Sequence, residues 1–144
     1  MASQNYANHR RYVILYHVVT FSIIVLLLIS SLYYIFKDAS MHQPMRGDMF
    51  FFLISLSLLF IFFFARVFSL KAQDRAIRAE ENFRHFLITG KPLDSRLTIR
   101  QIIGLRFASD EEFSELAKRA VDEKMKEDDI KKAIKNWKPD FYRV

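Results

Sequence analysis

The sequence predicts an all-α membrane protein: a two-helix transmembrane hairpin, whose second helix extends into the cytoplasm, followed by a small helical C-terminal tail domain. Two observations predict this fold class. Residues 12–36 and 49–65 contain no Asp, Glu, Lys or Arg, although these types make up 26% of the 144 residues. Residues 71–144, in contrast, hold 17 of the 22 basic and 14 of the 16 acidic side chains. Long uncharged runs are typical of membrane-spanning helices, and the charged remainder is typical of a soluble part.

Residues 12–36 predict the first transmembrane helix, preceded by a cytoplasmic N-terminus at residues 1–11. A helix of about 20 apolar residues crosses a hydrocarbon core of about 30 Å. Tyr12 and Tyr16 lie at one end of this run, and Tyr33 and Tyr34 lie at the other. The outermost pair is separated by about 33 Å of helix, so we expect these rings at the two membrane interfaces. A cleaved signal peptide would have a shorter apolar core and a small-residue cleavage site.

Residues 37–48 predict an external loop, and residues 49–70 predict the second transmembrane helix. The loop is polar and contains the helix breakers Pro44 and Gly47. Arg66 lies in the last turn of the second helix, where its guanidinium can extend to the membrane interface, and Lys71 follows it. We therefore expect both side chains at that interface.

The basic residues near the ends of the two runs predict the orientation. The N-terminal side and the loop carry two Lys or Arg residues each near the membrane, which is a tie. The segment after the second run decides it with five basic residues: Arg66, Lys71, Arg75, Arg78 and Arg84. Since cytoplasmic flanks carry the excess of Lys and Arg, both termini are predicted to be cytoplasmic.

Residues 71–90 predict a cytoplasmic helical extension of the second transmembrane helix. No Gly or Pro occurs from Asp48 to Thr89, so one helix can continue until Gly90. Alternating spacings of four and three place small residues on one stripe between larger apolar ones, a pattern that favours a helix-packing seam. The alternative is that Ala is simply the best helix former. The seam consists of Ala65, Ser69, Ala72, Ala76 and Ala79, and the stripe continues to Phe83 and Phe86.

Residues 91–144 predict the helical C-terminal tail. Thr98 with Gln101 and Ser109 with Glu112 both match the capping-box pattern, so each pair predicts a helix start. A third helix is expected from Asp128 or Asp129, carrying Ile130, Ile134 and Trp137 and closed by Pro139. Three short helices make a small core, so we expect them to pack on the long helix or on a partner.

Charge and motif content bear on binding and chemistry. Residues 66–106 carry a net charge of +5, which favours contact with anionic lipid headgroups. No nucleic-acid-binding motif accompanies the basic residues, so no nucleic-acid partner is predicted. The chain has no Cys, three Gly and scattered His residues, which excludes Cys-based sites and glycine-rich phosphate loops. We predict no catalytic residue, no cofactor, no metal site and no enzymatic activity.

Two stretches of the tail resemble an uncharacterised family of small two-span bacterial membrane proteins. They are residues 97–112, LTIRQIIGLRFASDEE, and residues 130–144, IKKAIKNWKPDFYRV. The resemblance implies the architecture of two spans and a cytoplasmic tail, and a place in the bacterial inner membrane, but it is silent on chemistry. Gly104 departs from the Ala-like residue expected there, which is predicted to weaken its helix by up to about 1 kcal/mol.

The function expected is that of a non-enzymatic accessory or scaffold protein of the bacterial inner membrane, whose cytoplasmic helices dock a protein partner or another copy. The alternative is a subunit of an oligomeric transport or channel assembly. Large apolar groups, Trp, Tyr and Arg often dominate binding energy, and they favour a docking role for the tail. Equally, Trp137 fits the tail's own core. The docking residues predicted are Arg100, Arg106, Phe107, Trp137, Tyr142 and Arg143.

Overall fold

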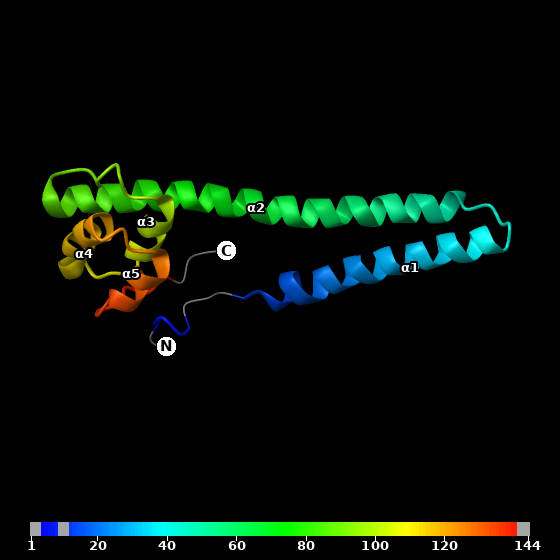
Figure 1. The fold of residues 1–144 in the computed structure, drawn as a ribbon, viewed down its shortest axis with the longest axis horizontal. Coiled ribbons are helices and arrows are strands. Elements are labelled where there is room, and N and C mark those ends of the chain that lie inside the picture. Colours follow the sequence, from blue (N-terminus) through cyan, green and yellow to red (C-terminus); the bar gives the residue numbers. More distant parts are fainter. Residues whose placement is uncertain (1–3, 9–11, 141–144) are drawn as a thin grey trace. The chain divides into compact units, whose positions relative to one another are not determined.

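The computed structural model describes residues 4–8 and 12–140, and within them every regular element is a helix (Figure 1). In chain order these are a π-helical segment η1 (Leu15–Thr20), then α1 (Phe21–Ser40), α2 (Arg46–Thr89), α3 (Ile99–Leu105), α4 (Asp110–Asp122) and α5 (Glu127–Ala133). The chain forms two compact units, which are described separately. The hairpin is the unit of residues 12–69, and the helical domain is the unit that contains residues 70–140 together with the N-terminal residues.

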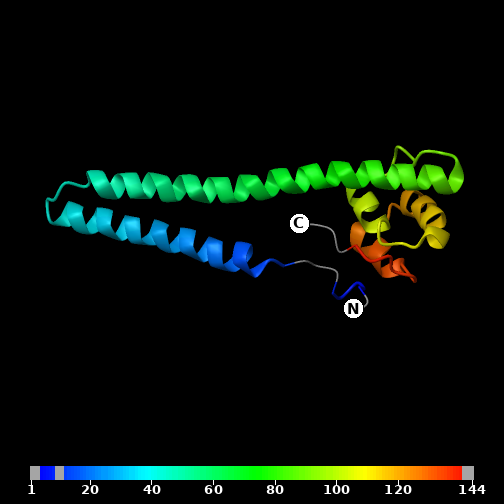
Figure 2. The same cartoon turned by 180° about the vertical axis from the view of Figure 1, so that it is seen from behind.

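In the hairpin, α1 and the first part of α2 run side by side in opposite directions (Figure 2). Aromatic side chains join them at one end. The Tyr16 hydroxyl donates to the carbonyl of Phe62 at 2.6 Å, and the two rings stack at 4.4 Å between centroids. The Phe21 ring lies 5.7 Å from that of Phe62.

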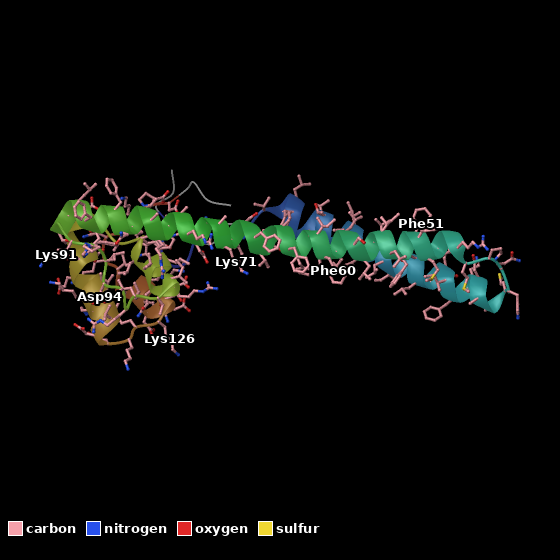
Figure 3. All side chains as sticks on the ribbon, turned by 90° about the horizontal axis from the view of Figure 1, so that it is seen from above. Phe51, Phe60, Lys71, Lys91, Asp94 and Lys126 are labelled. Carbon is pink, nitrogen blue, oxygen red and sulfur yellow. The ribbon has the colours of Figure 1, made fainter. Side chains whose placement is uncertain are left out.

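Two helices are long and apolar enough to span a membrane, at Leu15–Ser40 and Arg46–Thr89. Most large apolar side chains of the hairpin are exposed, including Phe51 and Phe60 (Figure 3). The hydroxyls of Ser31 and Ser55 are satisfied locally, because they donate to the carbonyls of Leu28 and Phe51 in their own helices. The helices thus present apolar side chains outward with their polar groups bonded within the chain.

The first helix and the connection differ in their limits from those predicted. Helical structure begins with the π-helical segment at Leu15 and continues to Ser40, beyond the predicted end of the apolar run at residue 36. The connection between α1 and α2 is therefore residues 41–45, not 37–48. Polarity marks where a chain leaves an apolar environment, whereas a helix ends only where the backbone must turn, here at His42 with a φ of 56°.

Helix α2 is unbroken from Arg46 to Thr89, which confirms that the second helix continues far beyond its apolar part. It ends at Gly90, whose φ of 71° is readily adopted by glycine. The Gly90 amide donates to the carbonyl of Phe86 at 2.8 Å, which satisfies one carbonyl of the last turn.

The helical domain packs α3, α4 and α5 against the C-terminal part of α2 (Figure 1). Its core combines Ile77 of α2 with apolar side chains from all three short helices and from the segments that join them. The largest fully buried side chains are Phe107, Phe113, Leu105 and Ile130. The expectation that the short helices pack on the long one is met through Ile77.

Gly104 lies where α3 packs closely on α5. A Cβ atom at this position would lie 3.1 Å from the carbonyl oxygen of Glu127 and 3.2 Å from a methyl carbon of Ile130. The lower helix propensity of glycine is therefore offset by the close approach of two helices, a tertiary effect that the local sequence does not show.

One of the two predicted capping boxes is present. The Thr98 hydroxyl accepts from the amide of Gln101, and the Gln101 side chain accepts in return from the amide of Thr98, so that box is confirmed. Ser109 is the N-cap residue of α4 but makes no side-chain cap hydrogen bond. Glu112 accepts instead from the amides of Lys135 and Asn136 at 3.1 and 3.0 Å, so the second predicted box is wrong.

Helix α5 is shorter than predicted. It ends at Ala133, and Ile134 already has extended backbone angles. Trp137 instead forms an isolated antiparallel bridge with Ala108. The backbone bonds that Glu112 accepts from this segment are incompatible with a further helical turn, so the segment 134–140 runs as a strap across the domain.

Candidate functional site

An arginine of α2 with a largely covered side chain connects three parts of the helical domain. The Arg84 side chain is 11% exposed and pairs with Asp110 of α4 at 2.6 Å and with Glu81 of its own helix at 3.0 Å. It also donates to the carbonyl of Ala108 at 2.6 Å. Its guanidinium lies 4.5 Å from the centre of the Phe113 ring. In the sequence, Arg84 contributes only to the predicted membrane orientation, because contacts with residues distant along the chain produce no local sequence pattern.

The pKa values of the two carboxylates next to Arg84 are shifted in opposite directions. Burial raises the pKa of Glu81, and the hydrogen bond and charge of Arg84 only partly oppose this shift. The hydrogen bond from Arg84 lowers the pKa of the exposed Asp110. Arg84 therefore compensates one buried and one exposed negative charge at the junction of α2 and α4.

Arg106, a predicted docking residue, lies in the interior of the domain. Its side chain is 8% exposed, it pairs with Asp140 at 3.3 Å, and its guanidinium lies 4.6 Å from the centre of the Phe107 ring. Burial lowers the pKa of Arg106, with Asp140 opposing the shift. Its Nε atom is buried and has no hydrogen-bond partner among the described residues.

Phe107 is a core residue, and the partly buried Trp137 packs against the same core. Phe107 is fully buried, and its ring centre lies 4.9 Å from that of Trp137. The Lys138 amide donates to the carbonyl of Phe107 at 2.8 Å, which fixes the strap against the residues after α3. Arg106, Phe107 and Trp137 thus hold the domain together, in agreement with the alternative that Trp137 fills the tail's own core.

The other predicted docking residues are not gathered with them. Arg100 is exposed on α3 and lies 3.6 Å from Glu127. Tyr142 and Arg143 lie outside the described residues.

A cavity of about 620 Å³ lies between α2 and the strap. Its walls combine ionisable side chains, with Glu81, Arg84, Arg106, Asp110 and Asp140 among them, and apolar side chains of α2, which include Ala76, Phe83 and Leu87. Acidic and basic groups there are paired with one another, as the contacts of Arg84 and Arg106 show. Among the described residues, no group of three or more His, Asp or Glu side chains is placed to hold a metal ion.

A second side of α2 is exposed. Because each residue turns by about 100°, the predicted stripe is turned away from the core-facing residues Ile77, Glu81 and Arg84, and its Ala76 and Phe83 also border the cavity. We call the part of the stripe in the helical domain, together with the adjoining Leu87, the outer face of α2. It comprises Ala72, Ala76, Ala79, Phe83, Phe86 and Leu87, all of them exposed.

Three large apolar side chains make the outer face unusual for a soluble domain. Phe83, Phe86 and Leu87 are 61%, 50% and 68% exposed. Phe86 and Leu87 each neighbour Phe83 on the helix surface, because they follow it by three and four residues. Contiguous exposed apolar groups of this size typically mark an interaction surface.

In the hairpin, the predicted seam residues Ala65 and Ser69 are also exposed. The stripe residue Phe62 is partly covered by Tyr16 and Phe21, so the free part of the stripe begins after it.

The predicted membrane-interface residues have two kinds of environment. Tyr12, Tyr33, Tyr34 and Lys71 are exposed, and Lys71 extends from α2 (Figure 3). Tyr16 and Arg66 are partly buried.

Comparisons with known proteins identify the chain through one family. No curated protein and no solved structure matches it. The model of the family described as "Family of unknown function (DUF6526)" matches residues 1–144, which is the whole chain. The predicted resemblance to an uncharacterised family is confirmed by this match, and the protein belongs to the DUF6526 family.

Proposed function

We propose that the protein is a non-enzymatic scaffold of the bacterial inner membrane, anchored by its hairpin and docking a protein through its helical domain in the cytoplasm. The observation that carries this proposal is that α2 has both a core-facing side and an exposed apolar side within the domain. One face closes the domain core through Ile77 and Arg84, while the other displays Phe83, Phe86 and Leu87 to the surroundings.

Membrane anchoring is supported by the hairpin. Its helices are long and apolar enough to span a bilayer, and the exposure of their large apolar side chains would be unfavourable in water. The orientation with both termini in the cytoplasm follows from the basic residues after the second apolar run. Lys71 is exposed there, where it can contact anionic headgroups.

Docking by the outer face is supported by its distance from the apolar run. Leu70 is the last residue of the predicted span, and 13 residues of helix, about 20 Å, separate it from Phe83. The exposed apolar groups of the outer face are therefore better explained by a protein partner than by insertion into the bilayer.

The alternative of a transport or channel subunit lacks a specific supporting observation. A pore wall needs a polar stripe along a span, and the polar side chains His17, Thr20 and Ser31 are the candidates. Each contacts a carbonyl of its own helical segment, at Val13, Leu15 and Leu28. These groups are satisfied locally, so they do not favour a polar path.

Isolation of the full chain from membranes in a mild detergent tests the proposal. Two differently tagged copies are co-expressed so that self-association is detected alongside other partners. We expect a protein that stays bound to the wild type and to the control Lys118→Ser on the exposed side of α4, and that is lost with Phe83→Ser combined with Phe86→Ser. Identical bound proteins in all three samples, or none in any, would contradict the proposal.

A further inference from the structure

We infer that the occupant of the outer face of α2 is the same face of a second copy, in a parallel two-stranded coiled coil. This inference rests on the proposed function, because two copies anchored in one membrane with the same orientation present parallel helices. It adds the identity of the partner and the register of the contact.

The spacing of the outer face fits such a coiled coil. Ala72, Ala76, Ala79, Phe83 and Phe86 alternate by four and three residues, which is the heptad spacing of positions a and d. All five are exposed, and Ala76 and Phe83 also border the open cavity between α2 and the strap. The small residues permit close approach of two backbones, and the two phenylalanines supply the apolar contact at the end of the seam.

The flanking charges specify the second copy. With Ala76 and Phe83 at position a, Arg75 takes position g and Glu80 takes position e of the following heptad. In a parallel pair, g of one helix faces e of the next heptad on its partner. Arg75 of each copy therefore meets Glu80 of the other, twice by symmetry. Both side chains are exposed, and no ion pair is formed by either one among the described residues.

Disulfide cross-linking in native membranes tests this arrangement, because the chain has no cysteine of its own. Ala72→Cys and Ala79→Cys each introduce one thiol at position d, about 10 Å apart along the helix. The parallel coiled coil predicts that each variant alone forms a disulfide dimer of twice 17.1 kDa under mild oxidation. Arg78→Cys, exposed on α2 outside the outer face, is the matched control and is expected to stay monomeric. Maleimide labelling after solubilisation confirms that all three thiols are reactive.

A charge exchange tests the register. Arg75→Glu and Glu80→Arg each place like charges opposite each other twice, and each is expected to weaken the dimer roughly tenfold. The double variant restores opposite charges and should recover the wild-type dimer. Because both residues are exposed, the helical domain should remain folded in all three variants.

The outcomes separate this inference from the proposed function. Cross-linking at only one of the two d positions indicates an antiparallel pair and overturns the inference. A cross-link to a different protein, or no cross-link by reactive thiols, also overturns it. If a partner is nevertheless lost with the Phe83→Ser and Phe86→Ser variant, the scaffold function stands with another occupant. If no partner depends on the outer face, both fail.

Discussion

At the scale of single residues, Arg84 and Gly104 hold the helical domain together in ways that only the folded chain reveals. Arg84 reaches Asp110, 26 residues away, and Gly104 allows Glu127 and Ile130 to approach α3. Both effects depend on contacts that are distant in sequence. The sequence alone therefore indicates a role of Arg84 only in the membrane orientation, and it predicts that Gly104 weakens its helix. The confirmed Thr98–Gln101 box, in contrast, is a local pattern of four residues.

Loss of the Arg84 charge is expected to destabilise the domain. Arg84→Gln leaves Glu81 buried without its partner and removes the contact with Asp110, so the free energy of unfolding should fall by about 3 kcal/mol. The fluorescence of Trp137, the single tryptophan of the chain, reports unfolding of the full-length protein in detergent. Arg78→Gln removes an exposed charge from the same helix and should change stability by less than about 0.5 kcal/mol. Equal effects of the two substitutions would contradict the role given to Arg84.

The raised pKa of Glu81 predicts a pH dependence of domain stability. The folded domain holds this proton more tightly than the unfolded chain, whose pKa is the ordinary 4.5. The contribution of Glu81 is therefore fully present below pH 4.5 and is lost as the pH rises through the raised pKa. Asp110, whose pKa is lowered, acts in the opposite sense and in a different window, below its ordinary value of 3.8.

Denaturant titrations between pH 4 and pH 7 check this dependence. Glu81→Gln cannot ionise, so the decline of stability above pH 4.5 should become shallower than in the wild type. Parallel pH profiles for the wild type and Glu81→Gln would show that Glu81 is not the group responsible.

Substitution of Gly104 by Ala is expected to lower the free energy of unfolding, although helix propensity alone would predict an increase. Gly104→Ala places a methyl group 3.1 Å from the Glu127 carbonyl, and overpacking of this kind costs about 1 to 3 kcal/mol. Thermal unfolding followed by Trp137 fluorescence measures the effect. The control is Lys118→Ala, at an exposed position of α4. A variant as stable as the wild type or more stable would mean that α3 and α5 do not approach so closely.

At the scale of elements, the sequence predicts helix starts better than helix ends. The limits of the first helix follow backbone geometry, so the predicted loop at 37–48 shrinks to residues 41–45. The last helix ends early because Glu112 accepts two amides of the following segment. The strap brings Trp137 onto Phe107, which is a long-range contact. The spacing of Ile130, Ile134 and Trp137 predicts a helix instead, because it reflects only local sequence.

The strap contributes to domain stability through Trp137. Trp137→Ala removes the ring that packs on Phe107, so the free energy of unfolding should fall by about 3 kcal/mol. Far-ultraviolet circular dichroism of the full chain follows this variant, since its fluorescence reporter is lost. Unchanged stability would place Trp137 outside the core and return it to a docking role.

At the scale of the whole molecule, composition and hydropathy are sufficient to predict two apolar helices and a charged helical domain, and these are present. The candidate docking site is less predictable. The sequence predicts the docking site at Arg106, Phe107 and Trp137, which have large side chains. In the structure these side chains pack within the helical domain. The stripe on α2 is visible as a sequence pattern, but only the structure shows that its Phe83 and Phe86 are exposed while Ile77 of the same helix is buried.

The central claim is that the hairpin spans the membrane and places the helical domain in the cytoplasm. Single-cysteine accessibility in intact cells tests it most directly, with Gln43→Cys in the connection and Lys118→Cys in α4, both at exposed positions. We predict that a membrane-impermeant maleimide labels the thiol at position 43 in intact cells and the thiol at position 118 only after lysis. Labelling of position 118 in intact cells, or of neither position until lysis, would contradict the claim.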